Sequence, residues 1–288
     1  MPMAQVNGVA LYYEEHGRGF PLVWSHEFAG DYRSWEPQVR FFSRRYRVIT
    51  YNARGYPPSD VPQEPGAYSQ EQAVEDLRGL LDHLGIVQAY VGGLSMGGSV
   101  ALHFGLRYPG RARALIVAGA GSGSDDPEGF RDRVNEMARR LETDGMAGME
   151  RYPHGPQRIQ FLRKDPLGWR RFVEGFMEHS PIGSALTFRG FQAGRAPIYE
   201  SAERLRTLDV PTLILTGDED DPCLGPAVFM KRHIPRSGLA VFPRTGHTIN
   251  LEEPDLFNRT VLDFLTAVEA GRWPPREQGD LEGALVPP

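Results

Sequence analysis

Short apolar runs alternate with amphipathic segments along most of the chain. One amphipathic segment begins after Ser69, carries Gln72 at the capping-box position and ends at Gly85, which predicts a helix. A second helix of the same period is expected from about Pro254. The apolar runs are bounded by turn residues and suit strands buried on both faces: Leu22–Ser25, Val48–Tyr51, Ala89–Gly93, Ala114–Ala118, Thr212–Thr216 and Leu239–Phe242. This alternation predicts an α/β fold with a doubly wound, mostly parallel sheet.

Two parts of the chain depart from this alternation. Near the beginning, Val9–Glu14 followed by Gly17 and Gly19 predicts an antiparallel edge hairpin before the parallel strands. Farther on, residues 122–197 contain helical patterns but no convincing buried strand. We therefore expect this second stretch to be an inserted helical cap.

The expected organisation is a core formed by residues 1–121 and 198–272, with the cap of residues 122–197 inserted into it. Residues 273–288 contain four prolines and little periodicity, so they predict an extended or loosely attached C-terminal tail. A chain of this length can bury a substantial core.

The sharpest chemical signal is Gly93-Leu94-Ser95-Met96-Gly97, which directly follows a predicted strand and opens a predicted helix. It matches the G-x-S-x-G turn, in which a strained serine is exposed and small flanking residues allow close approach. A serine that merely caps the helix would not need these glycines. The pattern therefore predicts Ser95 as a nucleophile, with the Met96 N–H at the helix start directed toward an oxyanion.

With this turn in place, the sequence resembles the α/β-hydrolase superfamily from about Val9 to Phe264. The segment Leu22–Gly30 is similar to the family's oxyanion loop, and Asn52–Ser59 resembles its D-x-R-G-x-G-x-S turn. The resemblance implies that the N–H of Phe28 is the second oxyanion donor. His26 is expected to bond loop backbone.

Two residues depart from the family pattern. Glu27 stands where the family usually has glycine, and Asn52 stands where it usually has aspartate. Glu27 is either a charged group that tunes the site or a peripheral carboxylate paired with an arginine. A carboxylate directed at the oxyanion would oppose catalysis unless a cation neutralised it. We therefore predict that Glu27 points away and that Glu27→Gln changes kcat/KM by only a few-fold.

The resemblance also supplies the remaining catalytic residues. The segment from Gly246 to Pro254 is similar to the family's G-H-x-x-x-x-E-x-P segment, which implies His247 as general base. The family places its triad carboxylate three positions after a glycine such as Gly217, which implies Asp220, with Asp221 as the alternative. The chain order serine, acid, histidine agrees with this assignment.

Composition restricts the possible partners. The chain has 32 basic and 37 acidic residues, a net charge of −5 and no long basic block, so no nucleic-acid partner is expected. No segment reaches the roughly 20 apolar residues of a membrane helix, and the first residues do not resemble a signal peptide. A single cysteine, Cys223, fits a reducing compartment. These observations predict a cytoplasmic protein with no membrane partner, and they indicate no oligomeric state.

Together, these residues predict a serine hydrolase that forms an acyl-enzyme on a small-molecule ester or lactone, without cofactor or metal. The alternatives are carbon–carbon bond hydrolysis of a dicarbonyl substrate, cofactor-free perhydrolysis, and a binding or receptor protein of the same fold with little turnover. Candidate substrate-binding residues are Glu27 and the apolar cap residues Trp169, Phe172, Phe176 and Phe188. Most of these apolar side chains could equally form the core of the cap.

Overall fold

Eight strands form one sheet in the computed structural model, which describes residues 2–276. The strand order is β1-β2-β4-β3-β5-β6-β7-β8. Pairing is antiparallel from β1 to β2 and from β2 to β4, and parallel between all later neighbours. The strands are β1 (Met3–Val6), β2 (Val9–His16), β3 (Pro21–Ser25), β4 (Arg47–Tyr51), β5 (Ala89–Leu94), β6 (Ala112–Ala118), β7 (Thr212–Gly217) and β8 (Ser237–Phe242). The predicted doubly wound, mostly parallel sheet is confirmed.

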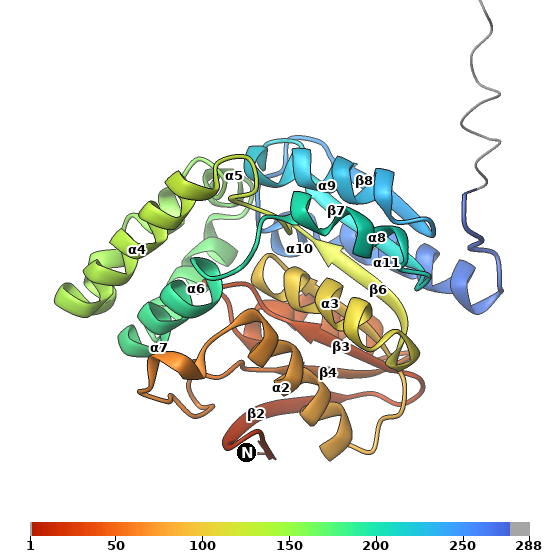
Figure 1. Cartoon of the computed structure of the whole chain (residues 1–288), viewed down its shortest axis with the longest axis horizontal. Helices are drawn as coiled ribbons and strands as arrows, with labels where there is room; N and C mark the ends of the chain where they lie inside the picture. Colours follow the sequence, from red (N-terminus) through yellow and green to blue (C-terminus); the bar gives the residue numbers. More distant parts are fainter. Residues whose placement is uncertain (1, 277–288) are drawn as a thin grey trace, which may run out of the picture.

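Helices cover both faces of this sheet (Figure 1). The α-helices are α1 (Glu36–Phe42), α2 (Gln70–His83), α3 (Met96–Arg107), α4 (Pro127–Asp144), α5 (Ile159–Lys164), α6 (Pro166–Met177), α7 (Pro181–Leu186), α8 (Ala202–Arg206), α9 (Asp221–His233), α10 (Ile249–Glu252) and α11 (Pro254–Glu269). Other helical segments include the 3-10 helices η1 (Tyr32–Trp35) and η5 (Tyr152–His154) and the π-helix η6 (Thr187–Gln192). Ser69 caps α2 through the N–H of Gln72, as the sequence predicts.

The buried side chains divide into one core on each face of the sheet. Val23 and Val91 pack with α2, α3, α8 and α9, whereas their neighbours Trp24 and Tyr90 pack with α1 and α11. Successive residues of a strand point to opposite faces, so a strand covered on both sides must be apolar throughout. This double burial explains the continuous apolar runs in the sequence.

Between β6 and β7 the described chain contains helices and no strand. Figure 1 shows α4, α6 and α7 gathered to one side of α2 and α3. Their apolar side chains form a third cluster, which also includes Phe28 and Ala29 from the loop after β3. The helical character expected for this region is present, and its division from the core at residues 122 and 197 stays a prediction.

The two ends of the described chain are both attached to the sheet. At the start, β1 pairs with β2 through a turn in which Asn7 and Gly8 both have positive φ. Near the other end, the Trp273 indole N–H donates to the carbonyl of Arg236, and its ring packs against Phe264. The first part of the predicted tail is therefore held rather than loose, and residues 277–288 lie outside the described residues.

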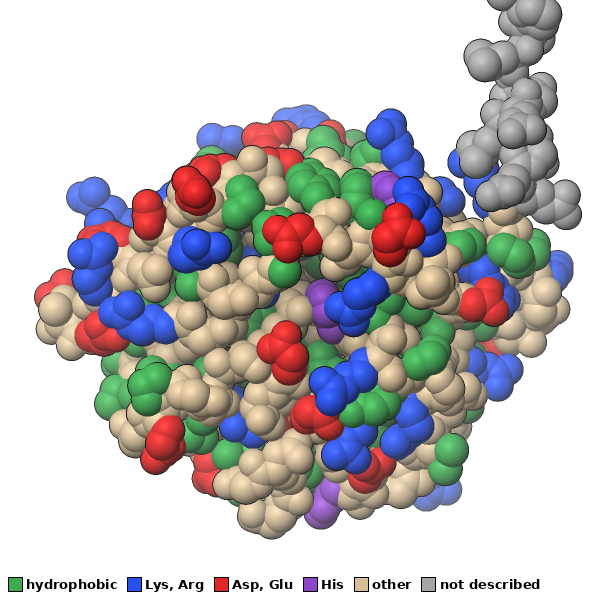
Figure 2. All heavy atoms as spheres, in the orientation of Figure 1, with side chains coloured by type: hydrophobic (Ala, Val, Ile, Leu, Met, Phe, Trp, Pro, Cys, Tyr) green, Lys and Arg blue, Asp and Glu red, His purple; other side chains and the backbone are tan. Residues whose placement is uncertain are grey.

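The surface charges reflect a sequence that has no long basic block. Figure 2 shows basic and acidic side chains interspersed over the face in view, without a large block of one sign. Within residues 2–276, no helix combines the length and the apolar character needed to cross a bilayer. The absence of a nucleic-acid partner stays a prediction.

Candidate active site

Ser95 occupies the sharp turn between β5 and α3. Its backbone has φ 56° and ψ −111°, a conformation that residues with a Cβ rarely adopt. The serine N–H donates to the carbonyl of Ala118 on the adjacent strand at 2.8 Å, which fixes the turn at the end of the sheet. Its hydroxyl makes no capping bond to α3. The Ser95 side chain therefore does not cap α3.

The glycines around Ser95 are required by close backbone contacts. A Cβ on Gly93 would lie 2.2 Å from the carbonyl atoms of Gly97. A Cβ on Gly97 would lie 1.9 Å from the carbonyl oxygen of Ser25 at the end of β3. These distances are far inside van der Waals contact, so a side chain at either position would force the surrounding backbone to move.

We expect Gly97→Ala to lower the free energy of unfolding by about 1–3 kcal/mol, because the added methyl must displace the end of β3. The same displacement moves the loop that carries Phe28, so activity is expected to fall as well. Chemical denaturation measures the first effect. Gly110→Ala is the matched control, because a Cβ there meets nothing within 4 Å; equal unfolding free energies for the two variants would contradict the crowding described here.

His247 and Asp220 form a buried hydrogen-bonded pair. The imidazole Nδ1 lies 2.7 Å from the Asp220 carboxylate, and the two side chains are 7% and 1% exposed. A proton on Nδ1 that is donated to this carboxylate leaves Nε2 as the acceptor nitrogen. Asp221 is instead exposed at the first position of α9. The geometry thus brings Asp220, and not its neighbour, to the histidine.

The imidazole lies at the same edge of the sheet as Ser95. A Cβ on Gly119 would be 3.5 Å from the His247 ring, and Gly119 directly follows Ala118, which accepts the Ser95 N–H. Ser95 and His247 are only 8% and 6% exposed. The three predicted catalytic residues are therefore all buried at this edge of the sheet.

The loop after β3 is held by His26. Its Nδ1 lies 2.7 Å from the carbonyl oxygen of Glu27, and its Nε2 accepts the N–H of Ala53 at 3.0 Å. This pairing requires the neutral ring with a proton on Nδ1, and burial lowers the pKa of His26 in the same sense. The expectation that His26 bonds loop backbone is confirmed.

Two backbone N–H groups are free to face the site. Met96 is the first residue of α3, so its N–H has no acceptor within the helix. The N–H of Phe28 has no hydrogen-bond acceptor among residues 2–276. The glycine contacts hold the turn that carries the Met96 N–H, and His26 holds the loop that carries the Phe28 N–H. Their role in binding an oxyanion stays a proposal.

Asn52 follows β4 and uses both ends of its side-chain amide. Its oxygen accepts the N–H of Tyr32 at 2.8 Å, and its nitrogen donates to the carbonyl of Pro57 at 2.7 Å. A carboxylate could not donate this second bond. The departure from the family's aspartate therefore has a local structural reason.

Glu27 is buried and paired with Arg158, which comes from the helical region. The guanidinium binds both carboxylate oxygens, one of them at 3.0 Å, and the side chains are 1% and 6% exposed. Burial disfavours the charged form of Glu27, but Arg158 outweighs that cost and holds the pKa of the carboxyl below its ordinary value. His247 is also close enough to Glu27 to act on it electrostatically.

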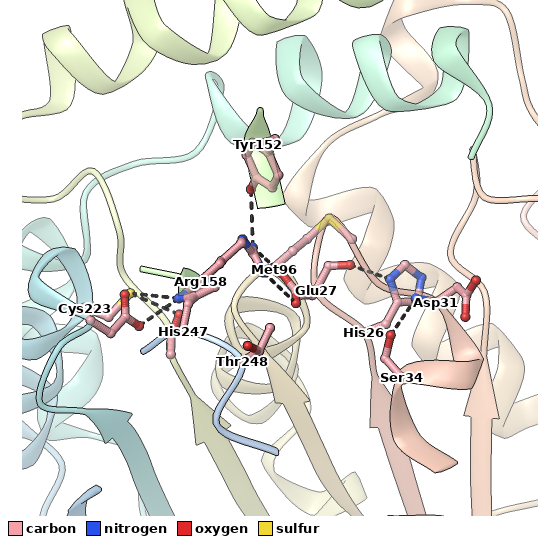
Figure 3. Close-up of polar contacts among 12 residues, drawn as sticks. His26, Glu27, Asp31, Ser34, Met96, Tyr152, Arg158, Cys223, His247 and Thr248 are labelled. Carbon is pink, nitrogen blue, oxygen red and sulfur yellow. Dashed lines mark hydrogen bonds and ion pairs between the residues drawn. The ribbon is translucent and has the colours of Figure 1, made fainter. Parts of the chain in front are cut away.

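The prediction that Glu27 points away from the active site is therefore wrong. Its carboxylate lies in the interior near the histidine, as Figure 3 shows, with Arg158 as its neutralising cation. The sequence analysis missed Arg158, because a lone arginine in an unassigned helical segment carries no motif. Pairing with an arginine was one of the two alternatives for Glu27, and the structure contains this pairing, although the carboxylate is buried and not peripheral.

The apolar candidates of the helical region mainly pack against one another and against Phe28. The Phe188 ring stacks on Phe28 with centroids 3.8 Å apart, and Phe176 meets Phe28 edge-on. Trp169 and Phe172 belong to the same buried cluster. Packing is therefore their observed role, and contact with a substrate stays a prediction.

Cys223 lies beside the Asp220–His247 pair. Its Sγ is within hydrogen-bond distance of the carbonyl of Gly119 at 3.2 Å and is 4.0 Å from His247 Nδ1. Burial raises the pKa of this thiol well above its ordinary value, so it stays protonated. These three residues are close enough to hold an ion in principle, but a protonated thiol is a poor metal ligand. The absence of a metal stays a prediction.

Comparisons with known proteins agree with this architecture. A family model described as alpha/beta hydrolase fold matches residues 21–254. The chain is 26% identical to 3-oxoadipate enol-lactonase 1 of Acinetobacter baylyi, covering 86% of this chain and 89% of that protein. It is 27% identical to a putative 2-succinyl-6-hydroxy-2,4-cyclohexadiene-1-carboxylate synthase of Bacillus subtilis, covering 86% and 90%.

Among solved structures, the enol-lactonase from Burkholderia xenovorans LB400 superposes with a TM-score of 0.81 at 26% identity, covering 92% of this chain and all of that one. The matched region extends from β3 to the first residue of α11 and contains Ser95, Asp220 and His247. The chain therefore belongs to the α/β-hydrolase fold family.

Proposed function

We propose that the protein is a serine hydrolase that cleaves a carboxylic ester or lactone of a small molecule. The observation that carries the proposal is the buried hydrogen bond from His247 to Asp220, placed at the sheet edge that also holds the strained Ser95. Strain at a serine and an oriented histidine together are characteristic of nucleophilic acyl transfer.

In the proposed reaction, Ser95 Oγ attacks the substrate carbonyl while His247 Nε2 takes the hydroxyl proton. Asp220 keeps the imidazole in the required tautomer and stabilises the imidazolium that forms. The N–H groups of Met96 and Phe28 bind the oxyanion. The imidazolium then gives its proton to the leaving alkoxide, and the same steps with water in place of Ser95 release the acid.

The class of substrate follows from the enclosure of the site and from the relatives. Ser95 is only 8% exposed beneath the helical region, which favours a small molecule over a polymer. An enol-lactonase with the same fold over nearly the whole chain makes a lactone a natural candidate.

A fluorophosphonate probe tests the mechanism without knowledge of the substrate. We expect covalent labelling of the wild-type protein at Ser95, followed by turnover of p-nitrophenyl esters of graded acyl length or of lactones. Absence of labelling would contradict the proposal and would favour a binding protein of this fold. Labelling with turnover of a vinylogous diketone but of no ester or lactone would instead indicate carbon–carbon bond hydrolysis.

A further inference from the structure

One short segment of the helical region contacts three loops of the core. We name residues 157–160, which follow the loop after η5 and include the first two residues of α5, the bridging segment. The carbonyl of Gln157 accepts the backbone N–H of His247 at 2.7 Å. The Gln160 side chain donates to Glu219 at 2.8 Å, in the loop that carries Asp220. The third contact is the Arg158–Glu27 ion pair.

These contacts are tight. A Cβ on Gly246 would lie 2.3 Å from the Gln157 carbonyl oxygen, so glycine before His247 is what allows the bridging segment to approach. Arg158 is also enclosed by aromatic rings, with its guanidinium carbon 5.0 Å from the Tyr152 centroid and 5.7 Å from that of Phe172. Figure 3 shows Tyr152 and Arg158 on one side of Glu27 and His247.

Glu27 connects this pairing to the oxyanion loop. It immediately precedes Phe28, and its carbonyl is bonded by both His26 Nδ1 and the N–H of Gly30. These two bonds hold the peptide unit that carries the Phe28 N–H, and the Glu27 side chain branches from the Cα at the start of that unit. The Arg158 partner is rigid, because it is buried and lies between two rings.

We infer that Glu27 and Arg158 are positioning residues: their buried ion pair fixes the oxyanion loop and keeps the surroundings of His247 electrically neutral. This inference rests on the proposed serine-hydrolase function. Removal of one partner leaves a buried charge without its counterion. This lowers the free energy of unfolding much more than loss of an exposed ion pair does. The retained charge then acts directly on the imidazolium that forms during the reaction.

Other charged and titratable groups surround this pair and the histidine, and their contributions are common to all variants. Asp220 and Cys223 contact the imidazole, and Glu252 accepts the N–H groups of Gly246 and Thr248 on either side of it. The remaining groups that face these residues are His26, Asp31, Tyr56, Tyr152, Lys164, His179, Arg195 and Glu219.

The test compares Glu27→Gln, Arg158→Met and the double variant. We expect each single variant to lower kcat/KM and the fluorophosphonate labelling rate by about ten- to a hundredfold, since small displacements of catalytic groups have effects of this size. This replaces the few-fold change expected from the sequence. Unfolding curves show whether each variant is folded.

The pH profile separates positioning from a general loosening of the fold. Glu27→Gln leaves an unpaired cation that disfavours the imidazolium, so the acidic limb should move to lower pH by about half a unit or more. Arg158→Met leaves the carboxylate and should move it to higher pH. Arg158→Lys keeps the charge and should leave the limb in place. If the acidic limb moves in the same direction in Glu27→Gln and Arg158→Met, the inference is overturned. It is also overturned if both variants are folded and neither shows a shift.

The double variant keeps the test decisive if the single variants do not fold. It removes both charges, so its acidic limb should stay near the wild-type position while labelling remains about tenfold slower. Wild-type labelling by the double variant would overturn the inference. The matched control is Glu142→Gln, which breaks the exposed pair with Arg189 in the same region and should change neither rate nor profile.

Failure of the inference and failure of the proposed function give different results. If the wild-type protein does not react with the probe, the serine-hydrolase function fails. If it reacts and the folded variants react equally fast with unchanged profiles, the function stands and only the positioning role fails.

Discussion

Ser95→Ala is expected to lower turnover by about a million-fold and to abolish labelling by the fluorophosphonate probe. The substitution removes the Oγ that would form the acyl-enzyme. No other side chain can take its place, because the strained turn presents only residue 95. The protein should remain folded, because Ser95 Oγ makes no hydrogen bond to the helix that it precedes. Steady-state kinetics measure the loss of turnover, and an unfolding curve shows whether the variant remains folded.

The stability of this variant is also informative. The backbone of residue 95 has positive φ in the wild-type protein, and alanine must adopt the same conformation. The alanine variant therefore retains the strain and should unfold at about the wild-type midpoint. Ester hydrolysis at the wild-type rate by this variant would refute the nucleophile assignment.

Asp220→Asn is expected to slow turnover by up to about four orders of magnitude. The carboxylate accepts the proton on His247 Nδ1 in a buried site, whereas an asparagine amide can donate to Nδ1 and favour the tautomer that cannot accept the serine proton. The rate of fluorophosphonate labelling should fall in parallel, because it depends on the same proton transfer.

Asp221→Asn is the matched control for this change. It alters an adjacent residue of the same type, but one that is exposed at the start of α9. Loss of a negative charge at a helix N-terminus costs about 0.3–1 kcal/mol of stability and should leave kcat nearly unchanged. If Asp221→Asn were the slower enzyme, the triad assignment would move to Asp221.

The parallel strands were predictable because each is buried on both faces. Trp24 and Val23 are adjacent in sequence yet belong to different cores, so every position of β3 had to be apolar. The first strand was missed, although Asn7-Gly8 is the dipeptide typical of a two-residue hairpin turn. The run before it, Met3–Val6, is only four residues long, which is too short for the alternation of exposed Gln5 with buried Ala4 and Val6 to identify a strand.

The sharp turn at Ser95 was predictable because the residues that form it are consecutive in the sequence, whereas the role of Ser95 as nucleophile stays a prediction. Five consecutive residues around Ser95 carry both the strain and the glycines that permit it. The carboxylate was harder, since four acids follow β7 within a few residues and sequence alone does not show which one turns inward. The structure separates them by burial, with Asp220 inside and Asp221 exposed.

The partner of Glu27 could not be predicted, because Arg158 is 131 positions away and belongs to no motif. The sequence offered pairing with an arginine as one of two alternatives for Glu27, without indicating which arginine. An arginine anywhere in the chain could have satisfied that condition, and the chain folds so that the helical region supplies it.

The contacts of the bridging segment have a consequence for protein engineering. One way to change the substrate range of a hydrolase of this fold is to replace its helical region with that of a relative. Here such a chimera would carry Arg158 and Gln157 away from Glu27 and His247, so a transplanted region without an arginine at the matching place would leave a buried carboxylate beside the reaction centre. The recipient core would then need glycine at position 27, which means that the two parts of this chain must be exchanged as a matched set.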